Sequence, residues 1–86
     1  MPDSMQLTFK LYASLTPYLP QGTAGHQVRI EVPSGTTAIE VLEQHGVPTA
    51  QVHLVLVNGL FVPPSSRADP LEEGDELAVW PAVAGG

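Results

Sequence analysis

The sequence predicts an α+β domain in which five strands form a mixed sheet and one main helix packs on one face of that sheet. Alternating apolar and polar residues, typical of half-buried strands, occupy residues 6–12, 27–32 and 76–80. Residues 38–45 have the three- and four-residue apolar spacing of a helix. One helix cannot cover both faces of a five-stranded sheet, so an α+β roll is expected.

The first two strands, residues 6–12 and 27–32, are expected to pair with each other in antiparallel orientation. The connection between them, residues 13–25, contains two prolines and two glycines, which favour an irregular path with one helical turn. Leu15, Tyr18 and Leu19 in this connection are expected to pack under the sheet. Residues 33–35, Pro-Ser-Gly, form the turn that ends the second strand.

Local signals mark both ends of the helix. Residues 37–40, Thr-Ala-Ile-Glu, fit a capping box, in which the Thr37 hydroxyl accepts the Glu40 N–H and the Glu40 carboxylate accepts the Thr37 N–H. The helix is expected to run to about His45. Gly46 is expected just after its end, and Pro48 prevents any continuation.

Residues 52–57 are the most apolar run of the chain and lead into Asn58-Gly59, a strong signal for a two-residue hairpin. Residues 60–62 are the expected return strand, which two prolines end. A polar loop then leads into the last strand, residues 76–80.

Alternation along the third strand predicts an exposed apolar patch. If Val55 points into the core, Leu54 and Leu56 point outward, because side chains alternate between the two faces of a strand. Outward leucines on an acidic domain indicate a docking patch with an acidic rim, formed by Leu54, Leu56, Phe61 and Trp80. Two alternatives stay open: the 13–25 connection covers this face, or both faces are buried. Trp80 is either an aromatic at the edge of the core or an anchor for the tail.

The last residues of the chain are Pro81-Ala82-Val83-Ala84-Gly85-Gly86. Glycine has no Cβ, so the final pair can enter a passage that admits little more than backbone. These six residues, fully extended, reach roughly 20 Å, enough to present the terminal carboxylate inside another protein. We therefore expect a domain over residues 1–80 and a flexible C-terminal tail over residues 81–86. The alternative is an ordinary frayed chain end.

Composition narrows the classes of function. Three basic residues against nine acidic ones give a net charge of −6, which argues against nucleic acid and against an anionic membrane as partners. The chain has no cysteine, and therefore neither a thiol nucleophile nor a thiolate metal site. His26, His45 and His53 lack the spacing of a metal site, so no metal ligand is predicted. No signal sequence or long apolar run is present, which indicates a cytoplasmic protein.

Taken in order, several short segments resemble the MoaD/ThiS family of ubiquitin-like sulfur carriers. Each segment is weak evidence alone, but together they extend from Leu7 to Gly86. The length and the long first connection are closer to the molybdopterin-synthase small-subunit branch than to the thiamine branch, although Ala82 stands where that branch often carries a proline. Besides the tail, the segments are Lys10-Leu11-Tyr12-Ala13, Val32-Pro33-Ser34-Gly35-Thr36-Thr37, Leu56-Val57-Asn58-Gly59 and Leu71-Glu72-Glu73-Gly74-Asp75-Glu76.

The resemblance implies a β-grasp, or ubiquitin-like, roll whose last strand lies centrally beside the first. It also implies that an E1-like adenylating enzyme uses ATP and Mg²⁺ to adenylate the carboxyl of Gly86, and that a sulfur donor protein or sulfide then gives a thiocarboxylate. The sulfur would pass to an accepting enzyme, such as a synthase large subunit, in molybdopterin-like cofactor biosynthesis. The activating enzyme would recognise the tail through Pro81, Val83, Ala84 and Gly85.

In this interpretation the chain is a carrier and not an enzyme, with no catalytic residue and no intrinsic cofactor. The sequence contains no phosphate-binding loop and no basic cluster, so partners would supply the activation chemistry. Two alternatives share the fold. A ubiquitin-like modifier would be conjugated to a lysine through Gly86, and a β-grasp interaction domain would use only its folded surface.

Overall fold

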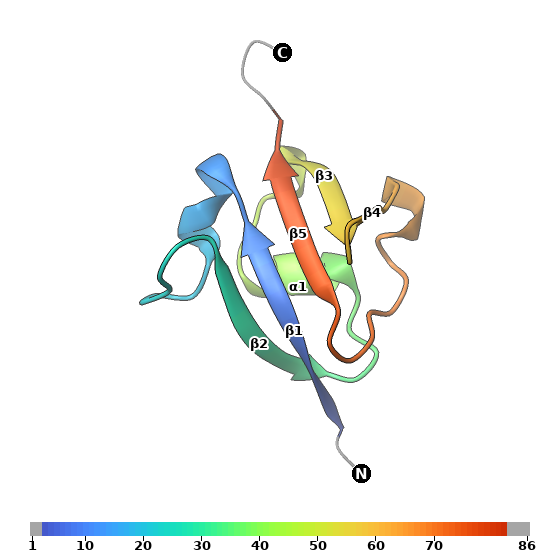
Figure 1. The fold of residues 1–86 in the computed structure, drawn as a ribbon. Coiled ribbons are helices and arrows are strands. Elements are labelled where there is room, and N and C mark those ends of the chain that lie inside the picture. Colours follow the sequence, from blue (N-terminus) through green and yellow to red (C-terminus); the bar gives the residue numbers. More distant parts are fainter. Residues whose placement is uncertain (1–2, 83–86) are drawn as a thin grey trace.

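The computed structural model describes residues 3–82 and forms a five-stranded sheet in the order β2-β1-β5-β3-β4, with α1 on one face (Figure 1). β1 runs parallel to β5, while the β1–β2, β3–β5 and β3–β4 pairs are antiparallel. The predicted mixed-sheet β-grasp fold is confirmed. The elements are β1 (Ser4–Leu11), η1 (Ala13–Tyr18), β2 (Gln27–Pro33), α1 (Ala38–Gln44), η2 (Thr49–Gln51), β3 (Val52–Val57), β4 (Leu60–Phe61), η3 (Pro64–Ser66) and β5 (Glu76–Pro81).

β5 occupies the centre of the sheet, as the resemblance implies. It pairs with β1 along one edge and with β3 along the other, and its Leu77 and Val79 side chains are fully buried. The strand ends at Pro81, which pairs with Val52, one residue beyond the expected end at Trp80. Proline has no N–H to donate to a ladder, so a strand readily ends there.

The helix has the predicted caps. The Thr37 hydroxyl accepts the Glu40 N–H at 3.1 Å, and the Glu40 carboxylate accepts the Thr37 N–H at 2.9 Å. At the other end Gly46 has a φ of 73° and Val47 donates to the Leu42 carbonyl at 2.9 Å, a Schellman arrangement. The buried face comprises Ala38, Val41 and Leu42, whereas Ile39 is only half-buried.

The core lies between α1 and the sheet. Its fully buried side chains are worth roughly 1.5–3 kcal/mol each in transfer free energy. The 13–25 connection closes one end of this core, because the Leu15 side chain is fully buried and Leu19 nearly so. The predicted helical turn there is a six-residue 3₁₀ helix. The largest core residues are Phe9, Leu7, Leu11, Leu15, Leu42, Leu77, Val41, Val55 and Val79.

Candidate functional site

The sheet face without the helix carries a continuous run of apolar side chains. Leu54 lies opposite Trp80 on the β3–β5 ladder, and Leu56 lies opposite both Ala78 and Phe61. Directly opposed residues share a face, and Val55 on the alternate parity is in the core. Because Tyr12 stacks on Trp80, it belongs to the same surface. We call these residues the apolar face: Tyr12, Leu54, Leu56, Phe61, Ala78 and Trp80.

Exposure varies across the apolar face. The Phe61 side chain is 59% exposed, Leu54, Leu56 and Trp80 are half-buried, and Ala78 is buried beneath its neighbours. The 13–25 connection packs against the core through Leu15. It therefore does not cover the apolar face, which was one of the two alternatives to a docking patch. Both leucines point outward, as predicted, yet each is partly covered by side chains beside it.

Aromatic rings stack where β5 approaches its end. The Trp80 and Tyr12 rings are parallel within 3°, with centroids 4.4 Å apart, and the His26 ring lies against Tyr12 at 4.6 Å. The Tyr12 N–H also donates to the Val79 carbonyl at 3.2 Å. Trp80 therefore lies half-buried on the apolar face, stacked on Tyr12, one residue before Pro81 ends β5. Sequence reasoning missed Tyr12, although its parity with Lys10 places it on the same face.

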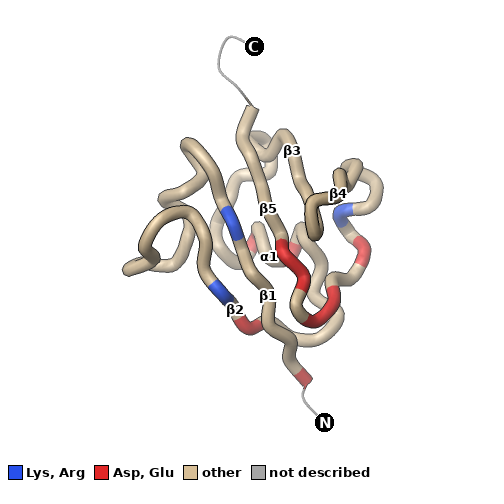
Figure 2. Tube along the Cα trace, in the orientation of Figure 1, with Lys and Arg blue, Asp and Glu red and all other residues tan. Residues whose placement is uncertain are grey.

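Charge is segregated from the end of the molecule where β5 stops. No Asp, Glu, Lys or Arg occurs in residues 11–28, 44–66 or 77–86. The end of β1, the start of β3 and the end of β5 meet there, since Leu11 pairs with Val79 and Val52 with Pro81. In Figure 2 the largest group of acidic residues surrounds the loop before β5, others lie on β2, on α1 and near the N-terminus, and none lies at this uncharged end.

The predicted acidic rim is therefore one-sided, and much of it is engaged in internal bonds. Asp75 accepts hydrogen bonds from the Asn58 side chain and the Glu72 N–H, both at 2.8 Å. The Glu76 carboxylate pairs with the Lys10 ammonium, and this hydrogen bond raises the pKa of Lys10 above its ordinary value. These carboxylates hold the loop before β5 and the start of that strand in place.

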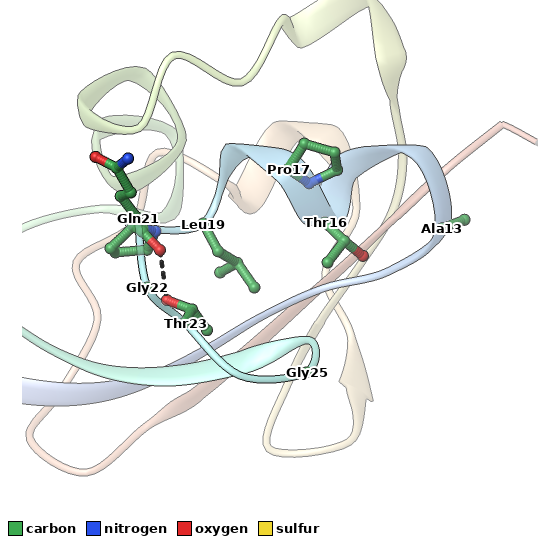
Figure 3. A pocket seen from close by; sticks show the side chains of 9 residues that line it. Ala13, Thr16, Pro17, Leu19, Gln21, Gly22, Thr23 and Gly25 are labelled. Carbon is green, nitrogen blue, oxygen red and sulfur yellow. Dashed lines mark hydrogen bonds between the residues drawn. The ribbon is translucent and has the colours of Figure 1, made fainter.

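A hollow of about 460 Å³ opens in the 13–25 connection (Figure 3). The Thr23 hydroxyl donates to the Pro20 carbonyl at 2.6 Å at its rim. No lining side chain titrates near neutral pH, so the hollow has no group for acid–base catalysis. Its lining residues are Ala13, Thr16, Pro17, Leu19, Pro20, Gln21, Gly22, Thr23 and Gly25.

Within residues 3–82, no group of three or more His, Asp or Glu side chains is placed to hold a metal ion. The His45 ring contacts the Val41 carbonyl at 2.9 Å and packs on Phe9 with centroids 4.8 Å apart. In the same part of the chain, no helix is long and apolar enough to cross a membrane.

Of the four tail residues predicted to be recognised by the activating enzyme, only Pro81 falls within the described residues, as the half-buried last residue of β5. Val83, Ala84, Gly85 and Gly86 lie outside the described residues.

A protein-family model described as Mut7-C ubiquitin matches residues 4–85. The chain belongs to the Mut7-C ubiquitin family. This match confirms the predicted resemblance to ubiquitin-like proteins. No curated protein sequence matches this member of the family.

Several solved structures share the fold of this Mut7-C ubiquitin chain. The HVO 2177 protein of Haloferax volcanii is 24% identical, with a TM-score of 0.74 over 98% of this chain and 89% of its own. Small archaeal modifier protein 1 of the same organism is 24% identical, with a TM-score of 0.67 over 94% of this chain and 99% of its own. A Pyrococcus furiosus protein described as molybdopterin converting factor, subunit 1 is 22% identical, with a TM-score of 0.63 over 92% and 99%.

Proposed function

We propose that the chain is a sulfur carrier whose Gly86 carboxyl is adenylated by an E1-like partner and converted to a thiocarboxylate. The observation that carries the proposal is the placement of β5. The strand that leads to Gly85-Gly86 is the central strand of the sheet, held on both edges and stacked through Trp80 on Tyr12. A rigid central strand gives a partner a fixed starting point from which to take up the chain end.

The chemistry follows from the carboxylate. A terminal carboxylate has a pKa of about 3.3–3.7, so it is ionised at neutral pH and needs a leaving group before it can react. Attack of a Gly86 oxygen on the α-phosphorus of ATP releases pyrophosphate and gives an acyl-adenylate. Mg²⁺ and cationic groups of the partner would stabilise the phosphate charge.

Sulfur then replaces AMP at the carbonyl carbon. Hydrosulfide attack gives the thiocarboxylate directly and releases AMP. Attack by the terminal sulfur of a donor's persulfide gives an acyl disulfide, whose S–S bond a second thiol of the donor must reduce. This chain has no cysteine, so every thiol that takes part in these reaction steps belongs to a partner protein. An accepting enzyme, such as a synthase large subunit, would take the sulfur into a cofactor of the molybdopterin type.

The apolar face is the proposed docking surface for these partners. Phe61 is more than half exposed beside Leu56, and the uncharged end of β5 is continuous with this surface through Trp80 and Leu54. A partner that covers Phe61 and Trp80 therefore also borders the point from which the tail begins. Exposed apolar area of this kind marks interaction sites on small proteins.

A second candidate function is protein modification, in which a lysine amine replaces sulfur as the nucleophile on the same adenylate. The fold shared with small archaeal modifier protein 1 motivates it. A third candidate, a β-grasp interaction domain, uses the apolar face without any chemistry at Gly86.

Mass spectrometry of the protein from its own cells separates the three. An oxygen-to-sulfur mass increase on a chain that ends at Gly86 supports the carrier, and Gly-Gly remnants on lysines of other proteins support the modifier. If neither product is found, or if the natural chain continues beyond Gly86 without processing, the interaction domain is the candidate function that remains. In reconstitution with the adenylating partner, Gly86→Ala should nearly abolish pyrophosphate release, whereas Ala82→Gly in the same tail serves as the control and should retain it.

A further inference from the structure

The outer edge of β2 presents unpaired backbone groups. In the β1–β2 register, the Leu11 N–H donates to His26 at 3.0 Å and the Ser34 N–H donates to Asp3 at 2.9 Å. Hydrogen-bonded and non-bonded pairs alternate along an antiparallel ladder, so even-numbered β2 residues face β1. The N–H and C=O groups of Gln27, Arg29 and Glu31 therefore point away from the sheet. No described strand pairs with them (Figure 1).

This edge carries charged side chains and a terminal proline, which are two of the usual protections against pairing, but it has no bulge and no described strand covers it. β2 is seven residues long, its register with β1 is continuous, and only Pro33 at its end lacks an N–H. Natural proteins usually shield a long edge with a bulge, an inward charge or a covering element. The other edge strand, β4, has just two residues and offers no comparable template.

We propose that β2 is a homodimer interface, in which two copies pair antiparallel about a twofold axis at Ile30. Arg29 of each copy then lies directly opposite Glu31 of the other, and each such pair exchanges two backbone hydrogen bonds. Ile30 faces its own equivalent across the axis. On the helix side, Val28 lies opposite Val32 of the second copy, which covers the half-buried Val28 and Ile30 side chains.

Backbone parity and charge together select this register. Outward groups meet only when odd-numbered residues pair with odd-numbered residues. A shift that centres the axis on Arg29 places the two arginines opposite each other, and an axis at Glu31 places the two glutamates opposite each other. Like charges in directly opposed positions destabilise a ladder, whereas opposite charges stabilise it. Of these registers, only the axis at Ile30 pairs Arg29 with Glu31.

The local charge suits self-association even though the chain is acidic. Lys10 and Arg29 lie on neighbouring strands of this half of the sheet (Figure 2). Among residues 3–82, Arg29 makes no salt bridge. The Ser4 hydroxyl donates to one carboxylate oxygen of Glu31 at 2.6 Å, which leaves the other oxygen available.

The dimer is compatible with the proposed carrier but does not depend on it. A twofold axis perpendicular to a shared sheet places both apolar faces on the same side. The two β5 strands then end in opposite directions, so one partner can bind each copy. Loss of Gly86 chemistry would leave the dimer unchanged, and loss of the dimer would leave Gly86 chemistry intact.

Charge variants test the register directly. In sedimentation from about 10 µM to about 1 mM, a range that covers moderate to weak association, the wild type should shift from monomer to dimer. Arg29→Glu alone and Glu31→Arg alone should each remain monomeric, because each places like charges opposite one another. An equimolar mixture of these two variants should restore the dimer, as should the double variant Arg29→Glu/Glu31→Arg. Glu43→Arg makes the same charge change as Glu31→Arg at an exposed position on α1. It is the matched control and should dimerise normally.

Amide hydrogen exchange supplies an independent readout and verifies that each variant is folded. At low concentration the amides of Arg29 and Glu31 should exchange fast while those of Val28 and Ile30 are protected. At high concentration Arg29 and Glu31 should gain at least tenfold protection. A wild type that stays monomeric at about 1 mM, with these two amides still exchanging fast, would overturn the proposal. A dimer that persists in both single variants would also overturn it, since its interface would lie elsewhere.

Discussion

Truncation of Phe61 separates a docking role from a structural one. The side chain is 59% exposed, so about two fifths of its surface is buried in the folded chain. Full burial of such a side chain is worth about 1.5–3 kcal/mol, so the buried part is worth about 0.6–1.2 kcal/mol. Phe61→Ala should therefore lower the free energy of unfolding by about 1 kcal/mol.

A matched core variant sets the scale. Leu77 lies on the opposite face of the sheet and is fully buried, so Leu77→Ala should cost about 2–5 kcal/mol, including the cavity that it leaves. Urea unfolding of both variants measures the two values under the same conditions. The ratio of the two losses in the free energy of unfolding tests the assignment of Phe61 to the surface.

Phe61→Ala, which has the smaller effect on folding stability, should have a large effect on partner binding. If Phe61 is an anchor of the docking surface, its loss should cost at least about 2 kcal/mol of binding, or about 30-fold in Kd. Titration calorimetry against the adenylating enzyme measures this with folded protein. The reasoning would be refuted by unchanged affinity in Phe61→Ala, or by a loss of folding stability as large as that of Leu77→Ala.

Three further outcomes are expected from local contacts. Thr37→Ala removes the capping hydroxyl and should lower stability by about 1 kcal/mol, measured by urea unfolding. Tyr12→Ala removes the ring stacked on Trp80 and should cost about 0.5–1.5 kcal/mol beyond the lost area, with a red shift of Trp80 fluorescence. The bond to Glu76 raises the pKa of Lys10 above 10.5, so its stabilising effect is complete below that pH and is lost as pH rises through the folded-state value. Lys10→Met should remove this alkaline loss from the pH profile of unfolding, and an unchanged profile would contradict the assignment.

Features that depend on neighbouring residues were predictable from the sequence. The Thr37–Glu40 box and the Gly46 cap form between residues three to five apart, so their signals are complete within one short segment. The outward parity of Leu54 and Leu56 follows from the period of two along β3. These local rules held because the tertiary fold does not oppose them.

Features that depend on sheet order were not predictable from periodicity. The central position of β5 came only from the family resemblance, because alternation does not say which strands are neighbours. The Tyr12–Trp80 stack joins the ends of β1 and β5, which the parallel pairing brings together. Likewise, Arg29 and Glu31 read as ordinary polar positions until β2 is known to be an edge strand. The positive φ of 54° at Ala13 had no signal, since alanine rarely adopts it.

The position of the charges leads to a final prediction about how partners arrive. A net charge of −6 suggests electrostatic steering toward a basic surface. Yet Glu76 begins β5 and Pro81 ends it, and five steps of about 3.3 Å separate them by about 17 Å. That distance exceeds the Debye length of about 8 Å at physiological ionic strength.

Moreover, Glu76 is paired with Lys10 on the same face, which reduces the field it projects toward the apolar face. Association with the adenylating enzyme should therefore slow only slightly as salt is raised, and stopped-flow measurement of the association rate would record this. A rate that falls steeply with salt would show that the acidic loop before β5 contacts the partner, and the docking surface would then extend from Phe61 toward Asp75 instead of toward Trp80.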